Sequence, residues 1–282
     1  MIVRLAAVQL AACTGDLARN RARAAEAVRL AAARGAEIVA LPELATLPYF
    51  CGDRPELYRS WAEPHDGPLA GGFAALARET RTTVLLPFYE HDRETGLYHN
   101  AVLGFGPDGS SLRPGPIARK LHLPVGQDPP PGFDEPAHFA PGDRLHVVET
   151  RGLQLGVLVC YDRRFPEAWR ALRTLGAELV VVPVAGSGGD DMDFFIGEMR
   201  THARENGLAV LCANKVGDEH VGGNVVDNYG WSAIIHADGT VLALRPGSEG
   251  PGLVVADLDV GAIPAIRRRL PYFDHRRPEL FM

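Results

Sequence analysis

The sequence has few cysteines. Only four occur in 282 residues, at Cys13, Cys51, Cys160 and Cys212. They are far apart and form no CxxC pair, which argues against a disulfide framework or a zinc site. We therefore expect reduced thiols in a cytoplasmic protein.

Long apolar runs and clusters of positive charge are also missing. No stretch approaches the roughly 18 apolar residues of a membrane span, and the apolar start MIVRLAAVQL runs into charged residues without a cleavage site. Lys and Arg number 29 against 35 Asp and Glu, a net charge of −6. Nucleic-acid binding draws on clustered basic residues. We expect neither a membrane nor a nucleic acid as a partner.

The residues that are present favour an α/β protein. Hydrophobic residues make up 46% of the chain, enough for a substantial core. Ile2–Val8 is a short apolar run of the kind found in strands, 19–34 has apolar residues at helical spacing before Gly35, and Ile38–Leu41 is a second apolar run. A strand, a helix and a strand in this order predict a βαβ unit.

The same alternation continues along the chain, so we predict one α/β domain over residues 1–282. Further helices are expected at Leu69–Thr80, Pro166–Leu175 and Phe194–Asn206, strands at Thr83–Tyr89, Asn100–Phe105, Leu153–Val159, Leu179–Val182, Leu208–Ala213 and Leu253–Leu258, and a hairpin at Trp231–His236 with Thr240–Leu244.

One segment breaks the pattern. Leu123–Pro141 holds six of the 22 prolines and shows no periodicity. Long loops inside compact domains are usually functional. Because strands and helices alternate on both sides of it, we interpret it as an active-site loop and not as a linker between domains.

Cys160 is a candidate nucleophile. An apolar strand leads up to it, and a helix is expected to start at Pro166 with Glu167 in its first turn. Such a turn exposes a side chain at the carboxyl edge of a sheet, where α/β proteins place their sites and where backbone N–H groups can face an oxyanion. The alternative is a buried structural cysteine, the more common fate of a free thiol.

Glu43 and Lys120 are weaker candidates when taken alone. Glu43 follows the second strand directly and could act as a general base if burial raised its pKa. Lys120, one of only two lysines in the chain, could favour a thiolate or stabilise an oxyanion. An exposed acid after a strand and a surface lysine are the ordinary alternatives.

Taken together, these fragments resemble the nitrilase superfamily of carbon–nitrogen hydrolases. Pro42-Glu43-Leu44, Arg119-Lys120-Leu121-His122 and Cys160-Tyr-Asp-Arg-Arg-Phe-Pro-Glu167 follow one another in the family's order. The resemblance implies a four-layer α-β-β-α sandwich and a metal-free Glu–Lys–Cys triad that needs no cofactor. It further implies a small-molecule substrate and assembly as a homodimer or larger homo-oligomer. It also implies that Glu135 is a second catalytic glutamate that orients the lysine.

The residues after Cys160 bear on the substrate. The pair Tyr161-Asp162 stands where nitrilases of the superfamily carry tryptophan and glutamate, so an amide or N-carbamoyl substrate is favoured over a nitrile. We expect the Tyr161 backbone N–H to help stabilise the oxyanion. Arg163 and Arg164 resemble arginines that bind a substrate carboxylate, a task suited to the guanidinium fork; pairing with a structural acid is the alternative.

Three other interpretations stay open at this level. The substrate could instead be cationic and be bound by Asp190, Asp191 and Asp193. The same triad could hydrolyse a nitrile. The chain could also be a non-catalytic binding protein on this scaffold, because fold does not determine function.

Overall fold

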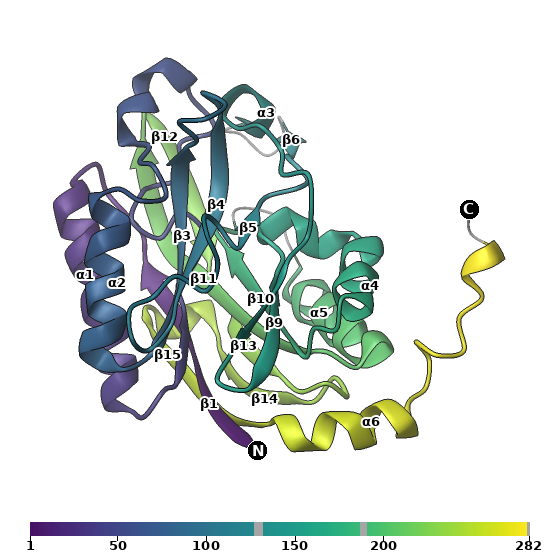
Figure 1. Ribbon diagram of the computed structural model, residues 1–282. Coiled ribbons are helices and arrows are strands. Elements are labelled where there is room, and N and C mark those ends of the chain that lie inside the picture. Colours follow the sequence, from purple (N-terminus) through teal and green to yellow (C-terminus); the bar gives the residue numbers. More distant parts are fainter. Residues whose placement is uncertain (127–131, 187–190, 281–282) are drawn as a thin grey trace.

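The computed structural model describes residues 1–126, 132–186 and 191–280. Its strands form a curled, mixed sheet that doubles back into two facing layers, with helices on both outer faces (Figure 1). This arrangement confirms the predicted α/β class and the four-layer α-β-β-α sandwich.

The first layer has the order β5-β4-β3-β2-β1, and β15 pairs with β1. Its strands are β1 (Ile2–Ala11), β2 (Ile38–Ala40), β3 (Thr83–His91), β4 (Tyr98–Phe105), β5 (Ala118–Arg119) and β15 (Gly252–Asp259). β1, β2 and β3 are parallel to one another.

The second layer has the order β11-β10-β9-β8, with β13 and β14 added beside β11 and with β12 also paired to β11. Its strands are β8 (Val147–Thr150), β9 (Leu153–Val157), β10 (Leu179–Val184), β11 (Ala209–Val221), β12 (Asn224–Tyr229), β13 (Ser232–Ile235) and β14 (Val241–Arg245). β9, β10 and β11 are parallel, and β11 joins the first layer where Lys215 pairs with Leu10 of β1.

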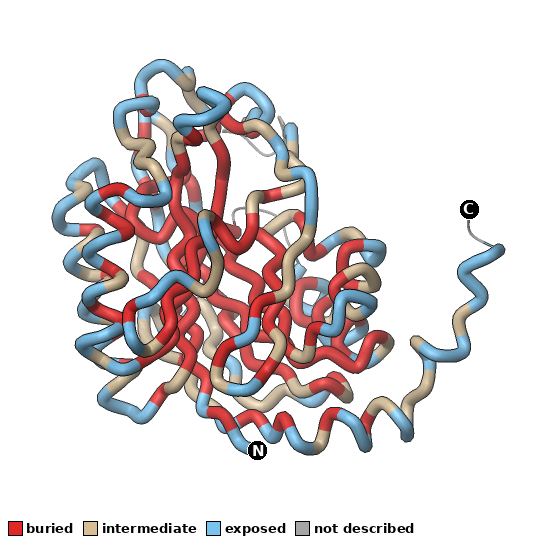
Figure 2. Tube along the Cα trace, viewed as in Figure 1, coloured by how far each residue is buried: buried red, intermediate tan, exposed pale blue. Residues whose placement is uncertain are grey.

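Two helices cover each outer face. α1 (Leu17–Ala33) and α2 (Pro68–Thr80) lie on the first layer, and α4 (Pro166–Thr174) and α5 (Met192–Asn206) on the second (Figure 1). α6 (Ile263–Arg269) lies at the base, and the chain then leaves the body. No residue of 271–280 is buried (Figure 2).

Shorter elements connect this frame. They are β6 (Val125–Gly126), β7 (Phe133–Asp134), α3 (Glu135–His138) and the 3₁₀ turns Pro55–Leu57, Arg59–Trp61, Cys160–Arg164, Gly247–Glu249, Val260–Ala262 and Pro278–Leu280.

The strands alternate between two cores because successive side chains point to opposite faces. On β1, Leu5 joins the core between the two layers, whereas Ala6 packs beneath α1 and α2. On β10, Val181 faces the other layer and Val180 faces α4 and α5. Every strand of this kind is buried on both sides, which explains its nearly continuous apolar sequence.

The predicted helices, strands and hairpin are confirmed, with shifts at their ends. The sequence interpretation missed α6, β8 and β12, and the strand expected at 208–213 continues to Val221. The segment Leu123–Pro141 contains β6, β7 and α3, while 127–131 lies outside the described residues. None of the helices in the described ranges has the length and apolarity that crossing a bilayer requires.

Candidate active site

The four predicted catalytic residues all follow or begin elements at one end of the sandwich. Glu43 follows β2, Lys120 follows β5, Glu135 starts α3, and Cys160 comes three residues after β9. Because β2 and β9 are linked through a continuous series of parallel pairings, their carboxyl ends face the same way. Active sites of α/β proteins form at this edge.

Lys120 lies between the two glutamates. Its Nζ is 2.9 Å from Glu43 Oε1 and 2.7 Å from Glu135 Oε1. All three side chains are at most 1% exposed. Two further donors hold Glu43: Asn100 Nδ2 is 2.7 Å from Oε1, and the Ala185 N–H is 2.9 Å from Oε2. The carboxylate of Glu43 is therefore oriented at both oxygens.

Cys160 faces this cluster from a constrained turn. It has φ of +50°, a left-handed conformation that is uncommon for a residue with a side chain. Its thiol lies close enough to the Glu43 carboxylate for the two groups to shift each other's pKa, and the residue is partly exposed. Arg163 Nη1 bonds the Cys160 carbonyl oxygen at 3.0 Å and lies 4.0 Å from Sγ. The sulfur thus sits beside a carboxylate and within reach of two cations.

The charges of the two glutamates differ, and here the sequence-based expectation was wrong. Burial acts to raise the pKa of Glu43, but the Lys120 ammonium and hydrogen bonds from Lys120, Cys160 and Ala185 outweigh it and lower that pKa below 4.5. It is Glu135 whose pKa is raised, to about 7, by burial and by the nearby charge of Glu43, despite Lys120. The single ammonium group of Lys120 is enough to keep Glu43 ionised, but it does not offset the effect of burial on Glu135, whose protonated form is therefore favoured.

The thiol is neutral in the resting site. Burial and the negative charge of Glu43 raise the pKa of Cys160 to about 12, against the smaller effects of Lys120 and Arg163. The expected help from Lys120 is therefore present but does not by itself produce a thiolate. Deprotonation needs an acceptor, and the ionised carboxylate of Glu43 is the acid whose charge acts most strongly on the thiol.

Asp162 joins the lysine segment to the cysteine turn. Its buried carboxylate accepts the backbone N–H of Leu121 at 3.1 Å, of His122 at 2.8 Å and of Val159 at 3.1 Å. The His122 ring adds a contact at 2.8 Å from Nδ1. One side chain therefore sets the spacing between the segments that carry Lys120 and Cys160.

The predicted substrate-binding residues lie around the same turn. Arg163 is buried, with Nε 3.2 Å from Glu198 Oε2, and Arg164 Nη1 is 3.7 Å from Glu198 Oε1. Tyr161 is partly exposed and packs its ring edge-on against Phe165. The structure thus pairs both arginines with an acid, and their contact with a substrate stays a prediction. Of the three acids considered for a cationic substrate, Asp190 lies outside the described residues.

Sequence reasoning missed several contributors to the site. Asn100 and the Ala185 N–H contact Glu43, and the Tyr49 hydroxyl donates to Glu135 Oε1 at 2.9 Å. Asp162 had a signal, its place in the cysteine motif; Asn100 had none, because an asparagine at a strand start is ordinary. In the parts of the chain that are described, no group of three His, Cys, Asp or Glu side chains is gathered as a metal site would need.

An α-β-β-α sandwich with a glutamate, a lysine and a cysteine at one edge has the architecture that the resemblance implied. Residues 4–268 match the family model for carbon–nitrogen hydrolases, and the chain belongs to that family. The predicted family and enzyme class are confirmed.

Similar proteins cover almost the whole chain. An N-carbamoylputrescine amidase of Solanum lycopersicum is 32% identical over 99% of this chain and 94% of its own. A carbon–nitrogen hydrolase from Helicobacter pylori G27 superposes with a TM-score of 0.89 at 28% identity, covering 100% and 97% of the two chains. A mutant amidase from Nesterenkonia sp. AN1 has a TM-score of 0.80 at 28% identity over 99% and 95%, and carries the acetamide moiety of fluoroacetamide on its active-site cysteine.

Proposed function

We propose that this enzyme hydrolyses the C–N bond of a small amide or N-carbamoyl compound, with Cys160 as the nucleophile. The observation that carries the proposal is the buried Glu43 carboxylate, which Lys120 bonds and keeps ionised, close enough to the partly exposed residue Cys160 for the carboxylate and the thiol to shift each other's pKa. A thiol, a base and an oriented cation are the parts that nucleophilic catalysis at a carbonyl requires.

In the first step, the Cys160 sulfur attacks the substrate carbonyl carbon while the thiol proton passes to Glu43. A free thiolate is unfavourable here because the pKa of Cys160 is about 12. Proton transfer therefore accompanies formation of the C–S bond. Lys120 and the Tyr161 backbone N–H stabilise the tetrahedral oxyanion.

The intermediate collapses when Glu43 returns the proton to the leaving nitrogen, and ammonia or an amine departs. Glu43 then takes a proton from water, whose oxygen attacks the thioester carbon. The C–S bond breaks, the acid product leaves, and Glu43 returns the proton to the Cys160 sulfur. Glu135 supports both steps by holding Lys120. Its second oxygen, Oε2, is buried and has no hydrogen-bond partner among the described residues. It is available to contact the substrate or the attacking water, and it donates the hydrogen bond when Glu135 is protonated.

Two observations support the substrate class that we propose. Tyr161 after the cysteine favours an amide or carbamoyl carbonyl, and the tomato relative is named for an N-carbamoyl compound. We favour an N-carbamoyl or simple amide substrate over a nitrile.

A substrate panel tests the proposal. Purified protein is incubated with N-carbamoyl amino acids, carbamoyl amines, ω-amides and nitriles, and ammonia release is measured. We expect turnover of at least one amide or carbamoyl compound, none by Cys160→Ala, and a mass increase on Cys160 after treatment with fluoroacetamide. Turnover by a folded Cys160→Ala protein at the wild-type rate would refute the role of the cysteine.

Two expectations from the sequence stay predictions. Assembly as a homodimer or larger homo-oligomer is tested by analytical ultracentrifugation, and cytoplasmic location by cell fractionation.

A further inference from the structure

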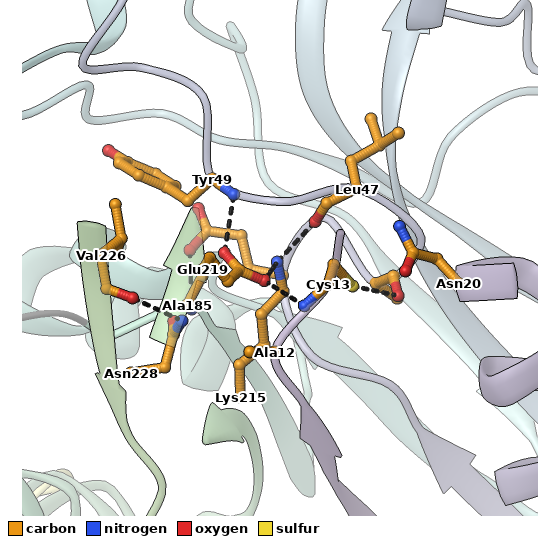
Figure 3. A network of polar contacts seen from close by, with 12 residues as sticks. Ala12, Cys13, Asn20, Leu47, Tyr49, Ala185, Lys215, Glu219, Val226 and Asn228 are labelled. Atoms are coloured by element: carbon orange, nitrogen blue, oxygen red, sulfur yellow. Dashed lines mark hydrogen bonds and ion pairs between the residues drawn. The ribbon is translucent and has the colours of Figure 1, made fainter. Parts of the chain in front are cut away.

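A second buried ion pair lies behind the catalytic cluster. Lys215 and Glu219, four residues apart on β11, have both side chains 0% exposed, and Lys215 Nζ is 2.9 Å from Glu219 Oε1 (Figure 3). Neither group takes part in the proposed reaction. The sequence did not predict this buried pair, because the residues on either side of Glu219, Asp218 and His220, are exposed.

The pair holds the loop that carries Glu43. Lys215 Nζ donates to the Leu47 carbonyl oxygen at 2.6 Å, and Glu219 Oε2 accepts the Tyr49 N–H at 2.7 Å. Glu219 Oε1 also accepts the Cys13 N–H at 2.8 Å, at the end of β1 (Figure 3). The backbone of this loop is thus held at Leu47 by the Lys215 ammonium group and at Tyr49 by the Glu219 carboxylate.

Tyr49 connects this pair to the catalytic cluster. Its backbone N–H bonds Glu219, and its hydroxyl donates to Glu135 Oε1 at 2.9 Å. The same Glu135 oxygen accepts Lys120 Nζ at 2.7 Å. A movement of the Tyr49 backbone therefore changes the position of Glu135 relative to Lys120.

Stability alone does not account for these residues. Burying two opposite charges carries a desolvation penalty that can exceed their attraction, and apolar residues of similar volume often stabilise a fold as well or better. The pair does, however, supply a cation and an anion that bond two specific backbone groups of one loop. Positioning of that loop is a function that apolar side chains cannot perform.

We propose that Lys215 and Glu219 are positioning residues for catalysis: they fix the Tyr49 backbone so that the Tyr49 hydroxyl holds Glu135 against Lys120. This inference rests on the proposed function, because it assigns the pair to that same site. It predicts that the contribution of Glu219 to turnover passes through the Tyr49 hydroxyl.

Glu219→Gln is the variant that tests the proposal most directly, because it removes one hydrogen bond and keeps the size of the side chain. The amide oxygen can still accept Lys215 and the Cys13 N–H, but the amide NH₂ then faces the Tyr49 N–H and that hydrogen bond is lost. We expect kcat to fall by about tenfold, since small displacements of catalytic groups have effects of this size, with KM changed by less than about twofold. The matched control is Glu79→Gln, which breaks the exposed Arg29–Glu79 pair and should leave kcat unchanged.

A double-mutant cycle with Tyr49→Phe separates positioning from a general effect on the fold. If Glu219 acts through the hydroxyl, Tyr49→Phe alone lowers kcat to a similar extent, and adding Glu219→Gln lowers it little further. Losses that multiply, or a folded Glu219→Gln variant with the wild-type kcat, overturn the proposal. If Glu219→Gln does not fold, Lys215→Met/Glu219→Leu replaces it in the same cycle under the same criteria.

A readout without substrate distinguishes this inference from the proposed function. The rate of Cys160 alkylation by iodoacetamide reports the arrangement around the thiol even if no compound of the panel is turned over. Absence of turnover by the wild-type protein would count against the proposed function. Equal alkylation rates in wild-type, Glu219→Gln and Tyr49→Phe proteins would count against the positioning pair.

Discussion

Glu43 and Glu135 share one ammonium group: the Oε1 atom of each carboxyl lies within hydrogen-bond distance of Lys120 Nζ, at 2.9 and 2.7 Å. Both carboxyls are buried, so they compete for a single positive charge. Glu43, which also accepts Asn100 and the Ala185 N–H, keeps its charge, and Glu135 is inclined to stay protonated. Two buried residues of the same type therefore have opposite pKa shifts in this site.

The first prediction concerns the pH dependence of stability at Glu135. Its pKa is raised from 4.5 to about 7 in the folded protein, so between these values the folded state binds a proton that the unfolded state has lost. The free energy of unfolding therefore falls as pH rises through this range, by about 3 kcal/mol at about 1.4 kcal/mol per pKa unit. Glu135→Gln has no such proton. We expect urea unfolding to give similar stabilities for the two proteins at pH 5 and a less stable wild type at pH 8; a difference that does not change with pH would contradict this.

The second prediction concerns Lys120. Lys120→Met removes the cation that keeps Glu43 ionised and that, in the proposed reaction, stabilises the oxyanion. We expect kcat/KM to fall by about 10²-fold or more, and stability to fall by about 3–5 kcal/mol, because a buried charge loses its partner. Steady-state kinetics and urea unfolding measure the two effects. Activity within tenfold of wild type would show that Lys120 is not needed for the chemistry.

The third prediction concerns Asp162, which accepts three backbone N–H groups from two segments. Asp162→Ala leaves these donors buried without an acceptor, at about 1–3 kcal/mol for each unsatisfied group. Asp162→Asn keeps one oxygen and should lose less. We expect the alanine variant to have a lower melting temperature and a lower kcat than the asparagine variant, by calorimetry and steady-state kinetics. Equal behaviour of the two would mean that the oxygens do not set the spacing of Lys120 and Cys160.

The fourth prediction concerns Arg163. Its guanidinium bonds the Cys160 carbonyl oxygen and contacts Glu198, so Arg163→Lys keeps the charge but loses the fork geometry. We expect kcat to fall about tenfold for acidic and basic substrates alike, since the substitution disturbs the turn that carries the proposed nucleophile, Cys160. A change confined to the KM of carboxylate substrates would instead assign Arg163 to substrate binding.

The pattern of apolar and polar residues along the sequence predicted much of the fold and part of the site. Apolar runs of four to seven residues located the strands, since both faces of each are buried, and helical spacing located α1, α2, α4 and α5. The position of Cys160 between an apolar strand and a proline-led helix placed it at the sheet edge. Elements that were missed, among them β5, β8, β12 and α6, are short or have exposed faces, so their sequences lack a clear apolar pattern.

The ordered motifs named Glu43, Lys120, Glu135 and Cys160 as a group, because each stands in a short segment with recognisable neighbours. What each group does electrostatically was decided only by the folded chain. Glu43 and Glu135 have opposite pKa shifts because different hydrogen-bond donors and charges surround their carboxyl groups. Glu219 bonds the backbone of Tyr49, which is 170 residues away in the sequence. Such contacts form only when the two sheet layers pack together, so they cannot be predicted from the residues that are adjacent in the sequence.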